Sequence, residues 1–204
     1  MFITCLDMEG VLTPEIWENV AISTGIDELM LTTRDEPDYD KLMKMRLKIL
    51  REHEISLKYI QNVISQMNPL QGAKDFMDWL REASQVIILT GSFIEFAKPL
   101  IRKLGNPTVF CHNLLTDKKG MITDYVLRIR DMKRTTVKSL NEMNFEVIAV
   151  GDSYNDTGML KEAKHGILFR APENVIQEFS QFPVVTEYSD LKALISRYLD
   201  LTSD

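Results

Sequence analysis

Three short apolar segments, each followed at once by a loop of acidic, hydroxyl or glycine residues, restrict the fold of this chain more than any other feature. The segments are residues 2–6, 86–89 and 146–150. Each is too short for a helix and contains isoleucine, leucine or valine, a pattern that predicts a buried strand. The following loops start at Asp7, Thr90 and Gly151. We expect these loops at one edge of a parallel sheet, where such sheets bind ligands.

Helices and further strands alternate from residue 71 onward. The pattern predicts helices over 73–82, 93–104, 132–143 and 156–164, and short strands over 108–111, 166–169 and 184–186. Residues 113–129 are expected to form an antiparallel excursion that turns at 117–120. The alternation predicts an α/β fold whose core is an open, Rossmann-like parallel sheet.

A block without strand signals separates the first predicted strand from the others. Its pattern predicts helices over about 14–24, 39–53 and 56–67, and a charged loop over 34–39. Thr13 is expected to cap the first of these helices, with Pro14 at its first position. We therefore predict two domains, a core of residues 1–12 and 71–204 and a small helical cap of residues 13–70.

Charge and cysteine content limit the partners and the compartment. The chain has 24 Lys and Arg against 30 Asp and Glu, a net charge of −6 at pH 7. This balance offers no basic surface for a nucleic acid or an anionic membrane, and we expect neither as a partner. Cys5 and Cys111 form neither a disulfide framework nor a zinc ligand set. With no signal peptide or membrane span in the sequence, we expect a cytoplasmic protein.

Four acids follow the predicted strand ends. They are Asp7, Glu9, Asp152 and Asp156. Clustered carboxylates repel one another unless a cation lies between them, and all-oxygen ligation suits Mg²⁺, which also binds substrate phosphate. An aspartate beside such a metal can act as a nucleophile toward phosphorus. Taken singly, each acid also fits an exposed turn or a helix cap.

Two cations, Lys133 and Arg134, lie in the first turn of a predicted helix that Asp131 can cap. The helix dipole disfavours positive charge at this end, so we expect an anionic partner. The alternative is two solvated cations without a partner.

The order of these motifs resembles that of the haloacid dehalogenase-like phosphatases over nearly the full length of the chain. The motifs are Asp7-Met8-Glu9-Gly10-Val11, Thr90-Gly91, Lys133 and Gly151-Asp152-Ser153-Tyr154-Asn155-Asp156. The resemblance implies an aspartyl-phosphate formed on Asp7, with Glu9 as general acid and base. It also implies Mg²⁺ held by Asp7, the backbone carbonyl of Glu9 and Asp152, with Asp156 supporting that site from behind.

The same resemblance implies how the phosphate is held. Thr90 and the amide of Gly91 would bind it, Lys133 would neutralise its charge and Asn155 would orient it. In the phosphoserine phosphatase branch, an arginine on a cap helix grips the substrate carboxylate and a glutamate pairs with its amino group. Arg46, among the apolar residues of the predicted 39–53 helix, and Glu15 match these two positions.

Glu9 stands where most members of the family have aspartate. This feature is similar to the bifunctional phosphoserine phosphatase/homoserine phosphotransferases, and makes homoserine a second candidate acceptor besides water. Thr90-Gly91-Ser92 departs from the Ser-Asp-Thr expected there and favours a plain phosphatase. Two alternatives are a phosphatase of another small phosphorylated metabolite and a non-catalytic protein that binds a phosphorylated ligand.

Overall fold

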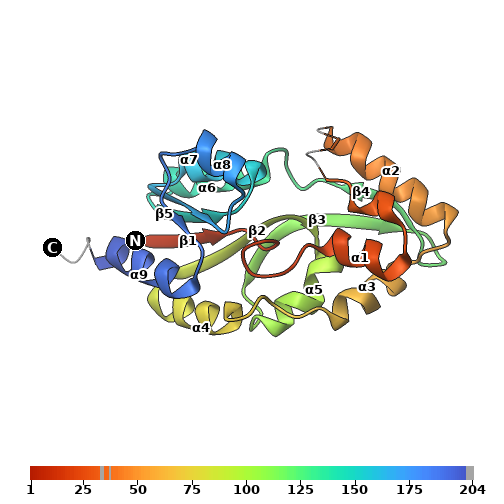
Figure 1. The fold of residues 1–204 in the computed structure, drawn as a ribbon, viewed down its shortest axis with the longest axis horizontal. Coiled ribbons are helices and arrows are strands. Elements are labelled where there is room, and N and C mark those ends of the chain that lie inside the picture. The colour runs from red at the N-terminus through yellow and green to blue at the C-terminus, as the bar shows by residue number, and fades with distance from the viewer. Residues whose placement is uncertain (33–34, 37, 201–204) are drawn as a thin grey trace.

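The computed structural model describes residues 1–32, 35–36 and 38–200 and contains one seven-stranded sheet (Figure 1). The strands are β1 (Phe2–Leu6), β2 (Gln85–Phe93), β3 (Thr108–Thr116), β4 (Ile122–Val126), β5 (Glu146–Gly151), β6 (His165–Phe169) and β7 (Val184–Val185). Their order is β4-β3-β2-β1-β5-β6-β7, and only the β3–β4 pair is antiparallel. The predicted α/β fold with an open parallel sheet is confirmed.

Helices cover both faces of the sheet and the ends of its central strands. The helices of the described residues are α1 (Ile16–Thr24), α2 (Tyr39–Glu52), α3 (Leu57–Gln66), α4 (Ala73–Ala83), α5 (Ile94–Lys103), α6 (Met132–Glu142), α7 (Thr157–Glu162), α8 (Glu173–Glu178) and α9 (Tyr188–Asp200). In Figure 1, α4, α5 and α9 lie below the sheet and α6, α7 and α8 above it. No helix among the described residues is long and apolar enough to cross a membrane.

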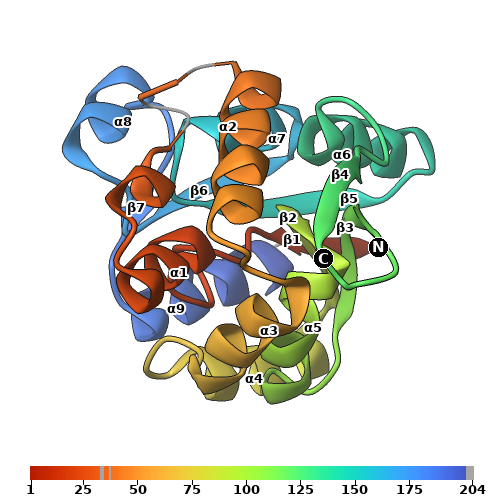
Figure 2. The same ribbon diagram turned by 90° about the vertical axis from the view of Figure 1, so that its right-hand side faces the viewer.

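Side chains of the buried strands alternate between two hydrophobic clusters, as the pleat requires. In β1, Phe2 and Leu6 enter one cluster, whereas Ile3 and Cys5 enter the other. The first cluster continues from the sheet into α1, α2 and α3. These three helices lie beyond the ends of the central strands, and Figure 2 looks at them from that side. The division into a core (1–12 and 71–204) and a cap (13–70) stays a prediction.

The register of the sheet aligns the three polar loops. Leu6 pairs with Ile88 of β2 and with Val150 of β5. Asp7 directly follows β1, residues 90–92 lie near the end of β2, and Gly151 is the last residue of β5. The three polar segments therefore lie together at the carboxyl ends of neighbouring parallel strands.

Several helix boundaries differ from the predictions. α1 begins at Ile16 and not at residue 14, because Thr13 is buried and its hydroxyl donates to the carbonyl of Met8. Asp131 precedes α6 with a positive φ of 48° and does not cap it with its side chain. α7 ends at Glu162, two residues early.

The sequence analysis missed α8 and α9, and part of one predicted loop cannot be compared. α8 and α9 follow the last long strand, β6, and flank the two-residue strand β7. The predicted charged loop over 34–39 includes residues 34 and 37, which lie outside the described residues. The helix predicted after it is observed as α2.

Candidate active site

Asp7 directly follows β1, the central strand of the sheet, and its side chain is buried. Its backbone amide donates to the carbonyl of Val150, which extends the β1–β5 pairing by one residue and fixes the direction of the side chain. Its Oδ1 accepts a hydrogen bond from the amide of Met8 at 2.7 Å and lies 2.8 Å from Nζ of Lys133. The carboxylate is therefore held by the chain on which it sits and by a lysine from α6.

Lys133 bridges two buried carboxylates. Its Nζ lies 2.8 Å from Oδ1 of Asp7 and 2.7 Å from Oδ1 of Asp156. Burial alone would lower the pKa of this lysine, but the charges of Asp156 and Asp7 outweigh that effect and raise it. The alternative of a solvated Lys133 without a partner is wrong, and Arg134 pairs with Glu162 at 2.8 Å.

Asp7, Asp152 and Asp156 form a cluster in which one oxygen of each lies within 4.8 Å of the others. Burial, followed by the charge of Asp156, raises the pKa of Asp7 to about 7. Burial, followed by the charge of Asp7, raises the pKa of Asp152 to about 8. These carboxylates therefore resist ionising together, and a bound cation would remove that resistance. Because every donor is an oxygen, the set fits a hard divalent ion.

Hydrogen bonds tie Asp156 to its own loop and to α6. Its Oδ2 accepts from the amides of Asp152 and Ser153 at 3.0 and 3.1 Å, while Oδ1 accepts from Lys133. The side chain is fully buried and does not line the cavity. Asp156 therefore fixes the loop that carries Asp152, while Asp7 and Asp152 face the cavity.

Two glycines make room for this cluster. A Cβ on Gly10 would lie 2.4 Å from Oδ2 of Asp152, and one on Gly151 would lie 2.3 Å from Cβ of Asp156. Gly10 also has a φ of +80°, which glycine tolerates best. The Gly10 backbone thus packs directly against the Asp152 carboxylate, beside the Glu9 carbonyl predicted to bind the metal.

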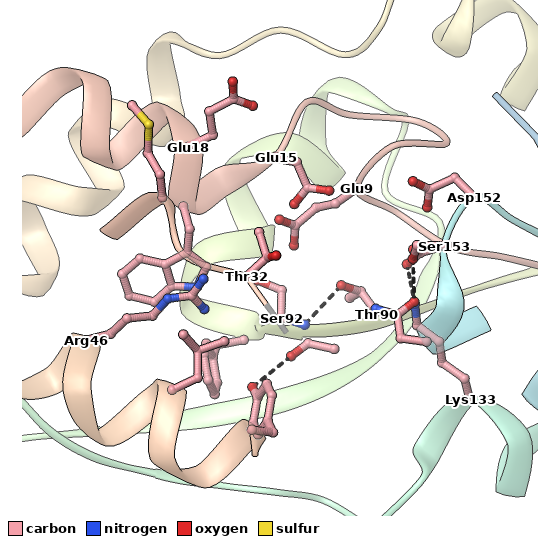
Figure 3. A pocket seen from close by; sticks show the side chains of 18 residues that line it. Glu9, Glu15, Glu18, Thr32, Arg46, Thr90, Ser92, Lys133, Asp152 and Ser153 are labelled. Atoms are coloured by element: carbon pink, nitrogen blue, oxygen red, sulfur yellow. Dashed lines mark hydrogen bonds and ion pairs between the residues drawn. The ribbon is translucent and has the colours of Figure 1, made fainter. Parts of the chain in front are cut away.

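Glu9 and Glu15 lie side by side at the start of α1 (Figure 3). Oε2 of Glu9 accepts a hydrogen bond from the amide of Ile16 at 2.9 Å, so Glu9 supplies the cap that Thr13 was expected to supply. Burial, followed by the nearby charge of Glu15, raises the pKa of Glu9 to about 8. A carboxyl group that keeps its proton near neutral pH can act as a general acid.

Thr90 to Ser92 form an irregular segment within β2, where the register of the β2–β3 pairing shifts between Leu89 and Phe93. Thr90 is buried, and its Oγ1 accepts a hydrogen bond from the amide of Ser92 at 3.0 Å. Apart from Gly91 and its two chain neighbours, no described residue has an atom within 4 Å of the position a Cβ would take on Gly91. The backbone at Gly91 is therefore open to a ligand in the cavity.

Arg46 extends from α2 to the other end of the cavity, opposite Lys133 in Figure 3. One guanidinium nitrogen donates to the carbonyl of Leu31 at 2.6 Å, and a second makes a long contact with the sulfur of Met43. The guanidinium also lies over the Trp17 ring. Its buried Nε has no hydrogen-bond partner in the described part of the chain. A buried cation with a free donor is suited to an anionic ligand.

A single cavity of about 510 Å³ contains nearly all the predicted site residues. Those that line it are Asp7, Glu9, Glu15, Arg46, Thr90, Gly91, Lys133, Asp152 and Asn155. Oδ1 of Asn155 accepts from the Ser153 hydroxyl at 2.8 Å and from Lys133 at 3.3 Å. The sequence analysis missed Trp17 and gave Tyr39 no role, because aromatic residues at helical spacing indicate a core face as readily as a cavity wall.

Comparisons with known proteins show the family and the fold to which the chain is similar. The family model described as haloacid dehalogenase-like hydrolase matches residues 5–164. The chain is 57% identical to phosphoserine phosphatase ThrH of Pseudomonas aeruginosa, over 94% of each chain. It is 56% identical to a phosphoserine phosphatase of Pseudomonas syringae pv. tomato, over 93% of this chain and 80% of that one. An apo phosphoserine phosphatase crystal structure shares the fold, with a TM-score of 0.76, 20% identity, and coverage of 96% of this chain and 98% of that chain.

Proposed function

The chain belongs to the haloacid dehalogenase-like hydrolases, and from this premise we propose that it is a phosphatase that hydrolyses O-phosphoserine through a phosphorylated Asp7. The observation that carries the proposal is the arrangement of the cavity. A carboxylate paired with a lysine lies at one end, and at the other lies a buried arginine whose Nε has no partner within the described chain. A small phosphate ester with a carboxylate at its far end matches both.

We propose Mg²⁺ as the metal, held by Asp7, Asp152 and the backbone carbonyl of Glu9. The three-carboxylate cluster, with its all-oxygen donors, supports this choice. When bound, the ion supplies positive charge that binds and polarises the phosphoryl oxygens. Lys133 adds a second positive charge on the same side of Asp7, and Asp156 keeps the Asp152 loop in place.

In the first step a carboxylate oxygen of Asp7 attacks phosphorus, and the bond from phosphorus to the serine oxygen breaks. Glu9 gives its proton to that departing oxygen, a role its raised pKa supports. In the second step Glu9 takes a proton from water, whose oxygen attacks phosphorus and releases Asp7 and inorganic phosphate. Thr90, the Gly91 amide and Asn155 would hold the phosphoryl oxygens throughout.

The amino-acid end of the substrate is assigned to Arg46 and Glu15. The guanidinium would bind the α-carboxylate, and the Glu15 carboxylate would pair with the α-amino group. We assign both to the helical segment of residues 13–70, which acts as the cap over the core of residues 1–12 and 71–204. The free thiols of Cys5 and Cys111 support our placement of the protein in the cytoplasm.

Homoserine is the proposed second acceptor. It carries the same α-amino and α-carboxylate groups as serine, so Arg46 and Glu15 could hold it against the phosphorylated Asp7. Its hydroxyl lies one methylene further from those groups, and the longer Glu9 side chain can reach it. Transfer would form phosphohomoserine in place of inorganic phosphate.

The test uses purified protein with Mg²⁺ and a panel of phosphate esters. We expect release of phosphate from phosphoserine to exceed release from phosphothreonine, phosphoethanolamine and sugar phosphates. Faster release from one of the other esters would mean that the site binds a different metabolite. If no ester is hydrolysed, the protein would be a non-catalytic protein that binds a phosphorylated ligand. With labelled phosphoserine and millimolar homoserine, label in phosphohomoserine supports transfer, whereas label only in inorganic phosphate excludes it.

A further inference from the structure

Two hydrogen bonds hold the peptide unit between Gly91 and Ser92, in the segment proposed to bind phosphate. One is made with a nearby residue and the other with a residue far away in the sequence. The N–H of this peptide unit donates to Oγ1 of Thr90 at 3.0 Å. Its carbonyl accepts a hydrogen bond from the hydroxyl of Tyr39 at 3.3 Å. Tyr39 is the first residue of α2, which belongs to a distant part of the sequence.

We propose that Tyr39 is a positioning residue for the phosphate-binding loop, and that α2 thereby connects the two ends of the substrate site. The inference rests on the proposed function, since it assumes that phosphate binds at Thr90 and Gly91. Tyr39 does not contact the reacting atoms in this proposal. It acts by fixing the plane of the peptide that follows Gly91.

The loop needs such support because the sheet does not provide it. The β2–β3 register shifts between Leu89 and Phe93, so the intervening residues leave the regular ladder. With the Ser92 N–H bound to its oxygen, the Thr90 hydroxyl keeps its own proton free to donate to a ligand. If this peptide rotated, the Thr90 hydroxyl would lose the Ser92 N–H that fixes its geometry.

Tyr39 is itself held in position. Its ring packs edge to face against Tyr125 of β4, with centroids 5.9 Å apart and an interplanar angle of 88°. Burial raises the pKa of Tyr39 to about 12, so the phenol keeps the proton that it donates to the Gly91 carbonyl. The hydroxyl is thus a fixed donor and not a group that turns freely in solvent.

The same helix carries Arg46, seven residues after Tyr39. Residues seven apart lie on the same face of a helix, and both side chains line the cavity. A carboxylate bound to Arg46 would restrain α2, and α2 would then restrain the Gly91 peptide through Tyr39. Binding of a substrate with an α-carboxylate would in this way restrict the movement of the residues that bind its phosphate group.

The experiment compares Tyr39→Phe with the matched control Tyr125→Phe. Phenylalanine keeps the ring packing and removes only the hydroxyl, so either variant should fold. The Tyr125 hydroxyl donates to Oδ1 of Asp40, the next residue of α2, at 2.6 Å. The control therefore removes a shorter hydrogen bond from the same end of the same helix, at a site away from Gly91.

Three quantities are measured for each variant with Mg²⁺ present: the inhibition constant of inorganic phosphate, KM for phosphoserine and KM for phosphoethanolamine, which lacks the carboxylate. We expect Tyr39→Phe to raise the phosphate inhibition constant about fivefold, as for loss of one hydrogen bond. Both KM values should rise, the phosphoserine value more. Tyr125→Phe should leave the inhibition constant within twofold of the wild type.

The inference is overturned if the phosphate inhibition constant of Tyr39→Phe equals that of the wild type, or if Tyr125→Phe raises this constant as much as Tyr39→Phe does. In either case the proposed function still stands, provided that the wild-type protein hydrolyses phosphoserine. A wild-type protein that neither hydrolyses phosphoserine nor is inhibited by phosphate overturns the proposed function and this inference together. The two failures are therefore distinguishable.

Discussion

The guanidinium carbon of Arg46 lies 4.5 Å from the centroid of the Trp17 indole ring. A cation over an aromatic face gains about 0.5–2 kcal/mol, depending on how far it is desolvated. Trp17 therefore holds one face of the guanidinium, while the Leu31 carbonyl holds one of its nitrogens. The buried Nε has no hydrogen-bond partner among the described residues.

Arg46→Ala and Glu15→Gln should each raise KM for phosphoserine far more than KM for p-nitrophenyl phosphate, which has neither an amino nor a carboxylate group. Loss of a desolvated charged partner should cost about 2 kcal/mol, or about 30-fold in kcat/KM. Glu18→Gln is the control, because Glu18, in the first turn of α1, is an acid that also lines the cavity. Equal effects on both substrates would mean that Arg46 and Glu15 have structural roles only.

Asp7→Asn should abolish turnover and leave the fold intact, because an amide keeps the shape of the carboxylate but cannot attack phosphorus. Lys133 would still pair with Asp156, so the thermal midpoint should stay within about 2–4 °C of the wild type, equivalent to about 1 kcal/mol. Circular dichroism and phosphate release check the two halves of the prediction. Substantial turnover in this variant with excess Mg²⁺ would rule out an aspartyl-phosphate.

The sheet and its polar edge could be predicted because local signals agree there. An apolar run followed by Asp7 or by Gly151-Asp152 indicates both the strand and its end. The start of α1 could not be predicted in the same way. Thr13 has the composition of an N-cap, but the capping oxygen belongs to Glu9, seven residues before Ile16, and only the tertiary fold brings them together.

Several contacts between side chains of the site could not be predicted from the sequence either. Lys133 was expected to meet an anion because of the helix dipole, but nothing in the sequence indicated that Asp156 is one of its two partners. Trp17 and Tyr39 read as ordinary members of apolar helix faces. Their roles depend on which residues face them, Arg46 and the Gly91 carbonyl, and those contacts form only after the chain folds.

Lys133→Met should destabilise the protein by about 3–5 kcal/mol, because it leaves the buried carboxylates of Asp7 and Asp156 without their cation. Arg134→Ala is the matched control on the same helix. Its ion pair with Glu162 is exposed, so this variant should unfold at the wild-type urea midpoint. Urea titrations of both variants measure the difference, and equal midpoints would show that the Lys133 pairs contribute nothing net.

Gly10→Ala should weaken metal binding by at least about tenfold, because its Cβ would displace the carboxylate of Asp152. Gly120→Ala is the control that distinguishes the steric clash with Asp152 from the backbone strain of a positive φ. Gly120 has nearly the same φ, +79° against +80°, but, its chain neighbours aside, no described residue lies within 4 Å of an added Cβ. Both variants should lose about 1–2 kcal/mol of stability from the positive φ. Only Gly10→Ala should need more Mg²⁺ for half-maximal activity, and a similar need in both variants would contradict the assignment.

Stabilisation by Mg²⁺ should increase with pH. The pKa values of Asp7 and Asp152 rise from 3.8 to about 7 and about 8 on folding, mainly through burial. Between pH 4 and 8 the metal-free folded state therefore binds more protons than the unfolded state, so its free energy of unfolding falls as the pH rises through this range.

A bound cation requires these carboxylates without their protons, so at low pH it competes with protons and at high pH it does not. At 100 times its dissociation constant the ion would add about 2.7 kcal/mol, or about 5–10 °C in the thermal midpoint at 2–4 °C per kcal/mol. We expect such a shift at pH 8.5 and almost none at pH 5.5, measured by thermal denaturation with and without Mg²⁺. Asp152→Asn should remove the shift at pH 8.5, and an equal shift at both pH values would mean that the ion binds elsewhere.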